Sequence, residues 1–254
     1  MRKNIIILLL LLIVCVACTN KTTIESNELQ EAISQVWLDA DQAQKALGKI
    51  NTSSLSEYEL QRYRLTEAHL MLKRDLRLPI ESNLDAMAKY FANCEDEASA
   101  SEAYYIQGAY LNYIGENTQA MQYLKKAESY PAASIIRCMT YYKMGRISES
   151  EQLYDIALEN YQKSLPYLEE AGLPLYLASV YRELGRNTHD KSRNQYFEKA
   201  LVAARLMGDT ILQMDIRYAQ LSANQENSPE LASICQYMCH TAGQKRYAYD
   251  LEKY

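Results

Sequence analysis

Two neighbouring stretches of the chain carry the same residue pattern at a constant separation of 37 positions. In each stretch, small residues recur beside large apolar or aromatic ones at matching places. The matched pairs are Tyr104 and Tyr141, Gly108 and Gly145, Ala120 and Ala157, Leu124 and Tyr161, and Ala127 and Ser164. Internal similarity at such a period indicates stacked copies of one supersecondary unit, because each copy buries its apolar face only against its neighbours.

The spacing within each copy is that of two helices joined by a turn, since residues three and four positions apart share one helix face. One face of the first predicted helix carries Tyr104, Gly108 and Leu111, and one face of the second carries Ala120, Leu124 and Ala127. A small residue where two helices cross lets the backbones approach, and a large one fills the space beside it. The clear repeats are predicted over 101–134 and 138–171.

Two weaker copies follow. The third, over 174–207, depends on Leu177, Val180, Leu184, Phe197 and Ala200. Tyr181 occupies its small position, which predicts either a wider crossing or a different register. The fourth, over 209–245, places Ala219 at the crossing and Leu231 with Cys235 on the second helix.

Helix breakers are scarce, with only 8 Gly and 5 Pro in 254 residues, which favours an all-α chain. Pro79, Pro174 and Pro229 fall at predicted first helical turns, where the missing N–H of proline costs nothing. Gly172 and Gly208 fall where a helix is expected to end. The breakers therefore divide the chain in agreement with the repeats.

Two further local signals predict helix geometry. Ser54 with Glu57 matches a capping box that opens a helix through about Lys73. Pro166 falls inside the second helix of its repeat, where proline is expected to free the carbonyl of Gln162. We therefore expect that helix to bend or end there.

The crossing residues resemble those of the tetratricopeptide repeat (TPR). The upstream segment 28–93, which includes the letters "KINTSSLSEYELQRYRL", resembles the N-terminal helices of TPR lipoproteins common in Bacteroides and its relatives. The resemblance implies antiparallel helix-turn-helix repeats stacked in a right-handed solenoid over 28–254. It also implies a protein–protein interaction scaffold or a sensor-type binding module.

The N-terminus has the pattern of an export signal. A basic Met1-Arg2-Lys3 precedes an apolar run that is too short to span a membrane, followed by small and then polar residues. Cys15-Val16-Ala17-Cys18 resembles a bacterial lipobox, in which Cys18 would be lipidated and become the mature N-terminus. A plain signal peptide or membrane anchor is the alternative. We therefore expect a signal peptide over 1–17, a linker over 18–27 and a periplasm-facing lipid anchor, with the outer membrane favoured over the inner.

The sequence contains no recognisable catalytic constellation. Its three histidines, His69, His189 and His240, are scattered, and no phosphate-binding glycine loop, nucleophile elbow or zinc-protease motif is present. The formal charge of -5 falls to -7 once Arg2 and Lys3 are removed, and no basic run gives a reason to expect nucleic-acid binding. We therefore expect a non-catalytic protein without a cofactor.

Four cysteines remain in the mature chain: Cys94, Cys138, Cys235 and Cys239. Cys235 and Cys239 share a helix face, but His240 points about 100° away from Cys239 and no second ligand pair is evident. Buried free thiols are therefore favoured over a metal site, and a disulfide stays open.

The TPR resemblance also implies a concave surface that holds a peptide or helix from a partner. The matching positions are Tyr105, Asn112 and Tyr113 in the first repeat, Tyr142 and Arg146 in the second, and Arg182 and Arg186 in the third. Tyrosine offers apolar area with a hydroxyl, and arginine offers a planar donor for carboxylates. For Tyr105, Tyr142 and the arginines, plain surface or packing is the alternative to a groove.

Two non-catalytic functions fit these features. The first is a lipid-anchored binding module that holds a protein or peptide partner. The second is an accessory lipoprotein of outer-membrane assembly or nutrient uptake, although the repeated junction pairs or large insertion typical of such proteins are missing. An enzyme is disfavoured because no catalytic constellation is present.

The lipidation hypothesis gives the first testable prediction. Cys18→Ala should abolish metabolic fatty-acid labelling and membrane retention, because the acylated thiol is lost. Cys15→Ala is the matched control and should leave both unchanged. Unchanged fractionation of the Cys18→Ala protein would refute the anchor.

Overall fold

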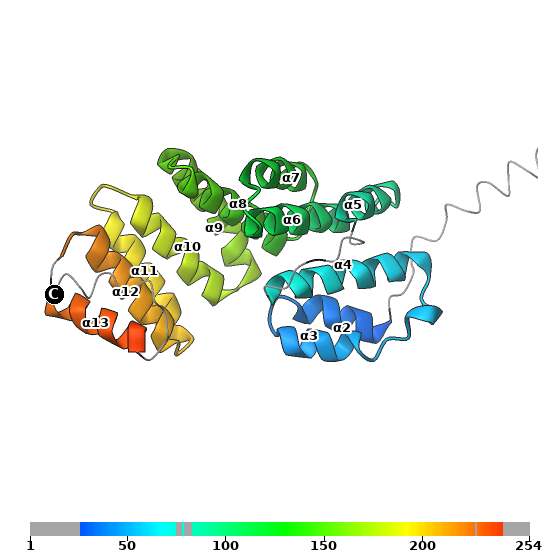
Figure 1. The fold of residues 1–254 in the computed structure, drawn as a ribbon, viewed down its shortest axis with the longest axis horizontal. Coiled ribbons are helices and arrows are strands. Elements are labelled where there is room, and N and C mark those ends of the chain that lie inside the picture. The colour runs from blue at the N-terminus through cyan, green and yellow to red at the C-terminus, as the bar shows by residue number, and fades with distance from the viewer. Residues whose placement is uncertain (1–25, 75–77, 79–82, 227, 241–254) are drawn as a thin grey trace, which may run out of the picture. The chain divides into compact units, whose positions relative to one another are not determined.

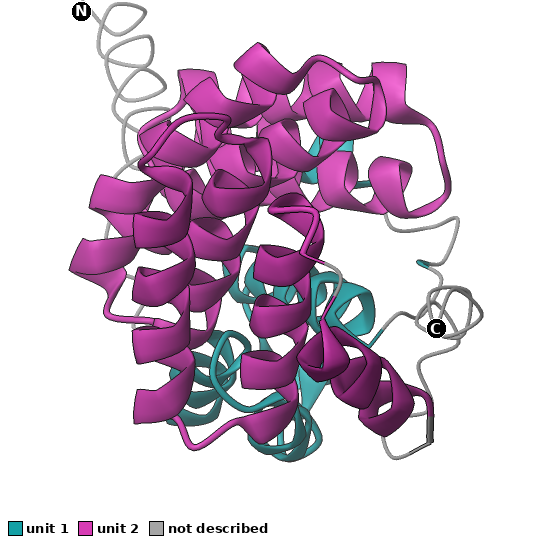
Figure 2. Ribbon diagram, turned by 90° about the vertical axis from the view of Figure 1, so that its left-hand side faces the viewer, with its two compact units in different colours: residues 1–87 teal, residues 88–254 magenta. Residues whose placement is uncertain are grey.

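The computed structural model describes residues 26–74, 78, 83–226 and 228–240. This part of the chain contains twelve α-helices and one short 3₁₀ helix and no β-strand, so the all-α prediction is confirmed (Figure 1). The predicted signal peptide, Cys18 and nearly all of the predicted linker lie outside the described residues. Within those residues, no helix is long and apolar enough to span a bilayer. The chain divides into two compact units, 1–87 and 88–254 (Figure 2).

Unit 1 is built from a small helical cluster. Its elements are α2 (Asn27–Gln35), α3 (Ala40–Leu47), η1 (Thr52–Ser54) and α4 (Glu57–Lys73), and α5 (Leu84–Asn93) crosses the unit boundary. An apolar core joins α2, α3 and α4 through Leu29, Ala32, Val36, Ala43, Ala46, Leu47 and Leu70. Helix α4 begins two residues later than the predicted capping box, because Ser56 and Glu59 form the box while Ser54 lies in η1.

Unit 2 consists of helices that pack as consecutive pairs. Its helices are α6 (Glu97–Tyr113), α7 (Asn117–Ser129), α8 (Ser134–Ser150), α9 (Tyr154–Ala171), α10 (Pro174–Asn187), α11 (Arg193–Leu206), α12 (Thr210–Ala223) and α13 (Pro229–His240). Pairs α6/α7, α8/α9 and α10/α11 make the most extensive contacts, and each pair also contacts the next. The predicted division into helix-turn-helix pairs is therefore present. The fourth predicted repeat was expected to end at residue 245, which lies outside the described residues.

Glycines mark the crossing in three of these pairs. A Cβ added to Gly108 would lie 2.8 Å from Leu124 of α7, and one added to Gly145 would lie 2.6 Å from the Tyr161 ring of α9. These are the predicted contacts. The third crossing is at Gly185, where a Cβ would lie 2.9 Å from the Phe197 ring. Tyr181 precedes Gly185 by four residues, as Tyr104 precedes Gly108 and Tyr141 precedes Gly145. The third copy therefore has a different register from the predicted one, in which Tyr181 stood at the crossing itself.

Many tyrosines pack inside the helix pairs. The equivalent residues Tyr104, Tyr141 and Tyr181 each face a tyrosine of the second helix in the same pair: Tyr123 at 6.2 Å, Tyr167 at 6.0 Å and Tyr196 at 6.3 Å between ring centroids. Aromatic pairs at such distances add stability beyond their buried area. Packing within the helix pairs therefore explains these six of the 22 tyrosines without a binding role.

The turns within three of the pairs share one backbone geometry. Gly115, Gln152 and Gln225 have φ values of 90°, 61° and 57°. The residue after each donates its N–H to a carbonyl five positions back, at 2.8 Å, 2.8 Å and 2.9 Å respectively. This is the Schellman bond that ends a helix and reverses the chain. Gln152 follows Gly115 by the same 37 positions that separate the first two crossings.

The structure excludes a helix end at Pro166, one of the two predicted alternatives, and it places Ala219 outside the core of the last pair. Helix α9 continues through Pro166 and ends only at Ala171, before Gly172 in the left-handed conformation. Pro166 and Gln162 are both exposed, so water can satisfy the carbonyl that the proline frees. In the last pair, Leu221 packs with Leu231 and Cys235, whereas Ala219 lines a cavity.

The crossing gives a stability prediction. Gly145→Ala should lower the free energy of unfolding by about 1–3 kcal/mol, because the new methyl group must displace the buried Tyr161 ring. Urea denaturation followed by circular dichroism measures this change. A Gly145→Ala protein as stable as the wild type would show that moving the ring costs no more than the roughly 1 kcal/mol that alanine gains over glycine inside a helix, and it would contradict the predicted loss.

Candidate functional site

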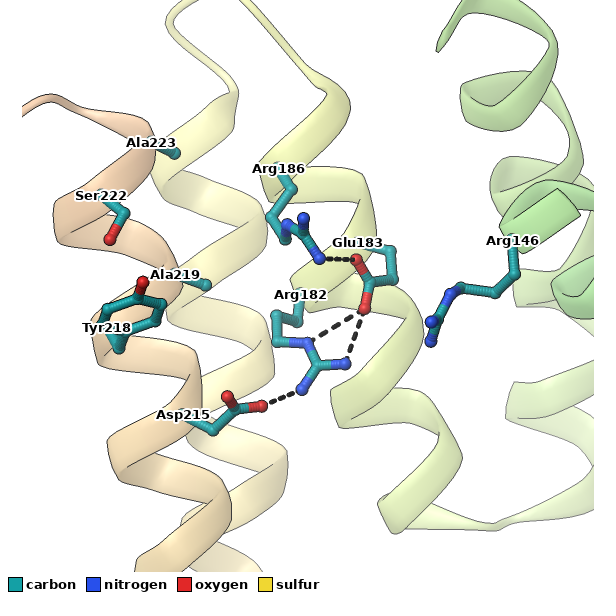
Figure 3. Close-up of a pocket in the computed structure, with 9 residues that line it drawn as sticks. All are labelled: Arg146, Arg182, Glu183, Arg186, Asp215, Tyr218, Ala219, Ser222 and Ala223. Carbon is teal, nitrogen blue, oxygen red and sulfur yellow. Dashed lines mark hydrogen bonds and ion pairs between the residues drawn. The ribbon is translucent and has the colours of Figure 1, made fainter. Parts of the chain in front are cut away.

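A cavity of about 470 Å³ opens in unit 2 among helices α8, α10 and α12. Figure 3 shows Arg146 extending from α8, Arg182 and Arg186 from α10, and Tyr218 and Ser222 on α12. The other lining residues are Glu183, Asp215, Ala219 and Ala223. Because three arginines and two carboxylates line one space, their pairing decides which groups the cavity presents to a ligand.

Glu183 is the buried centre of this charged network, with 0% of its surface exposed. One carboxylate oxygen accepts bonds from Arg182 Nη2 at 2.6 Å and Nε at 3.1 Å, and the other accepts from Arg186 Nη1 at 3.1 Å. Arg182 also donates to the carboxylate of Asp215 on α12. A buried charge is tolerated only with such partners. The guanidinium of Arg182 is therefore held between α10 and α12.

The network continues to the preceding helix pair. Arg186 Nη2 lies 3.4 Å from Glu149 of α8, and the hydroxyl of Tyr161 on α9 donates to Glu149 at 2.8 Å. Burial, together with the charges of Glu183 and Glu149, raises the pKa of Tyr161, so its phenol stays protonated as a donor. Residues of α8, α9, α10 and α12 are therefore joined through one set of polar contacts.

Arg146 differs from the other two arginines of the cavity. It is exposed, and its Nη1 lies 3.4 Å from the hydroxyl of Tyr142. Among the residues that the structure describes, no carboxylate pairs with Arg146. Partial desolvation of the guanidinium lowers the pKa of Arg146, but Tyr142 and Glu183 raise it by more, so Arg146 stays charged. Arg146 is therefore a cation whose donors are largely available to a ligand.

The structure divides the residues predicted to form a concave surface. Arg146, Arg182 and Arg186 line the cavity. Tyr142 does not line it but accepts a hydrogen bond from Arg146. Tyr105 is only 3% exposed, and burial strongly raises its pKa, so it belongs to the packing between helices and the groove assignment was wrong for it.

Asn112 and Tyr113 lie elsewhere, at the turn of the first pair. Asn112 donates to Asn117 at 3.0 Å, and Tyr113 is 49% exposed with its ring 6.5 Å from that of Tyr110. Neither residue lines the cavity.

Sequence reasoning missed the carboxylates and the α12 wall of the cavity. Glu183 directly follows Arg182, and a single acidic residue on a helix is usually read as surface charge. Asp215 lies in the weakest repeat, where no groove position was assigned. A signal existed, because Asp215 follows Arg182 by 33 residues, close to one repeat length.

The cysteines and histidines of the described chain form no cluster with the cavity. Cys94, Cys138, Cys235 and Cys239 form no disulfide in the described part of the chain; Cys138 and Cys235 are buried, Cys239 is half-buried and Cys94 is exposed. Burial raises the pKa of Cys138 to about 12, so this thiol stays protonated and unreactive. His69 is buried against Trp37, with 4.3 Å between ring centroids.

Comparisons of the chain with known protein family models, with curated proteins and with solved structures found no match. Function is therefore inferred from the cavity and the repeated helix pairs.

The network gives a second stability prediction. Arg182→Met should lower the free energy of unfolding by about 3 kcal/mol, because Asp215 and Glu183 lose a buried partner. Lys163→Met removes the exposed pair with Glu159 on α9 and is the matched control. Urea denaturation should give a clearly lower midpoint for Arg182→Met than for the control. Equal midpoints would contradict the role of the network.

Proposed function

We propose that the protein is a non-catalytic binding module of the cell envelope whose helix pairs stack as a TPR-like right-handed solenoid and hold a protein or peptide partner. The observation that carries this proposal is the cavity itself, which is lined from three first helices, α8, α10 and α12. A stack of repeats brings the first helices of successive pairs side by side, which is how repeat proteins form extended binding surfaces.

The equivalent positions after Tyr104, Tyr141 and Tyr181 support a binding surface confined to the later repeats. These positions hold Tyr105, Tyr142 and Arg182. Tyr105 is buried, whereas Tyr142 and Arg182 are half-buried. The positions after the crossing glycines hold Ala109, Arg146 and Arg186, and both arginines are exposed. The polar side chains of the proposed binding surface therefore begin at α8 and continue to α12.

The second part of the proposal is the anchor. Lipidation at Cys18 would attach the module to a membrane by its N-terminus, facing the periplasm and with the outer membrane favoured. The helical units would then be displayed beyond a short linker, where a partner from the envelope can reach the cavity. The mildly acidic composition supports a protein partner over a nucleic acid.

A photo-crosslinking amino acid placed at Ser222 tests the proposal. Ser222 is exposed and lines the cavity, so a bound partner in the native envelope should give a discrete crosslinked adduct. Ser233 is an exposed serine of α13 outside the cavity lining, and the same amino acid placed there is the matched control. Absence of an adduct at Ser222, or the same adduct from both positions, would contradict a partner site in the cavity.

A further inference from the structure

We infer that the cavity binds a carboxylate of an acidic peptide segment, with Arg146 as its principal donor and Arg186 as the second. This inference rests on the proposed function, because it names the chemistry of the partner that the cavity would hold. It goes further in assigning different roles to the three arginines.

The first argument is the difference in exposure between acids and bases. The side chains of Glu183, Asp215 and Glu149 are 0%, 12% and 16% exposed, whereas that of Arg186 is 49% exposed. Arg146 is exposed as well. A ligand that enters the cavity therefore meets guanidinium N–H groups before it meets the carboxylates that balance them.

The second argument is the number of donors already used. Arg182 places three of its nitrogens on Glu183 and Asp215, so it holds the wall in place and offers little to a ligand. Arg146 has five N–H donors, as every arginine does, and bonds the neutral hydroxyl of Tyr142. Its fork matches a carboxylate, which can accept two parallel bonds.

The opposite wall of the cavity suits a peptide. On α12, Ala219 and Ala223 are small, and Tyr218 and Ser222 carry hydroxyl groups (Figure 3). Small side chains leave width for a backbone, while hydroxyls can donate to or accept from peptide groups. In this arrangement the α12 wall contacts the peptide backbone, while Arg146 on α8 binds the acidic side chain.

The charge of the whole chain excludes a general attraction to anions. The formal charge is -5, so a polyanion is repelled by the molecule on average. At about 0.15 M salt, exposed charges more than about 8 Å apart are largely screened. Binding of an acidic peptide under these conditions would therefore report a local site.

Binding of fluorescein-labelled hexaglutamate to the detergent-solubilised full chain, followed by fluorescence anisotropy at 0.15 M salt (roughly physiological), tests this inference. Saturable binding is expected, and Arg146→Gln should weaken it by about tenfold or more, because a charge-assisted bond is lost. Arg146→Lys should restore part of the affinity, since it keeps the charge but loses the fork. Arg205→Gln changes an exposed arginine of α11 outside this cavity and should have no effect.

Several outcomes would overturn the inference. These are no saturable binding of hexaglutamate, equal binding of hexaglutamine, or the same loss of affinity in Arg146→Gln and Arg205→Gln. Ser222→Trp narrows the cavity without removing a charge and should also weaken binding, so a folding defect in one variant does not decide the result. If crosslinking at Ser222 persists while hexaglutamate does not bind, the carboxylate inference fails and the proposed partner site stands; loss of the crosslink contradicts the proposed function itself.

Discussion

The close approach of two helices at a glycine is the constraint on which unit 2 depends. Gly108, Gly145 and Gly185 each leave room for one large side chain of the second helix, and no larger residue fits without displacing it. Because the fit is repeated, successive helix pairs have comparable geometry and bury comparable faces. The inner positions three residues before and one residue after each glycine are thereby brought into related places on the first helices.

Different residues occupy these inner positions along the chain. At α6 the inner position is filled by buried Tyr105, and at α10 it is filled by Arg182. An arginine at such a place requires acids, and they are supplied by Glu183 on α10 itself and Asp215 on α12. Of the arginines that pair with these buried acids, Arg182 is largely buried with them, whereas Arg186 is exposed. The same contacts that tie helix pairs together therefore also create the charged surface proposed to bind a partner.

The sequence predicted the helix pairs well because their determinants are local and periodic. Glycine and its large neighbour recur at fixed spacing, so Gly108 with Leu124 and Gly145 with Tyr161 could be matched directly. At Tyr181 the sequence left a wider crossing and a different register open, and the structure has the different register, because the interval from Gly145 to Gly185 is longer than that from Gly108 to Gly145. Burial was harder to predict: Tyr105 and Tyr142 occupy equivalent positions, and only the packing of neighbouring pairs distinguishes them. Asp215 was missed because its partner lies on another helix.

Hydrogen exchange of the full chain, measured by mass spectrometry with and without hexaglutamate, tests most directly the central claim that this cavity is the binding surface. We expect slower amide exchange in the parts of α8 and α12 that carry Arg146, Tyr218 and Ser222, and unchanged exchange in α13. Slower exchange confined to α13 or to unit 1, with none at α8 and α12, would contradict the claim.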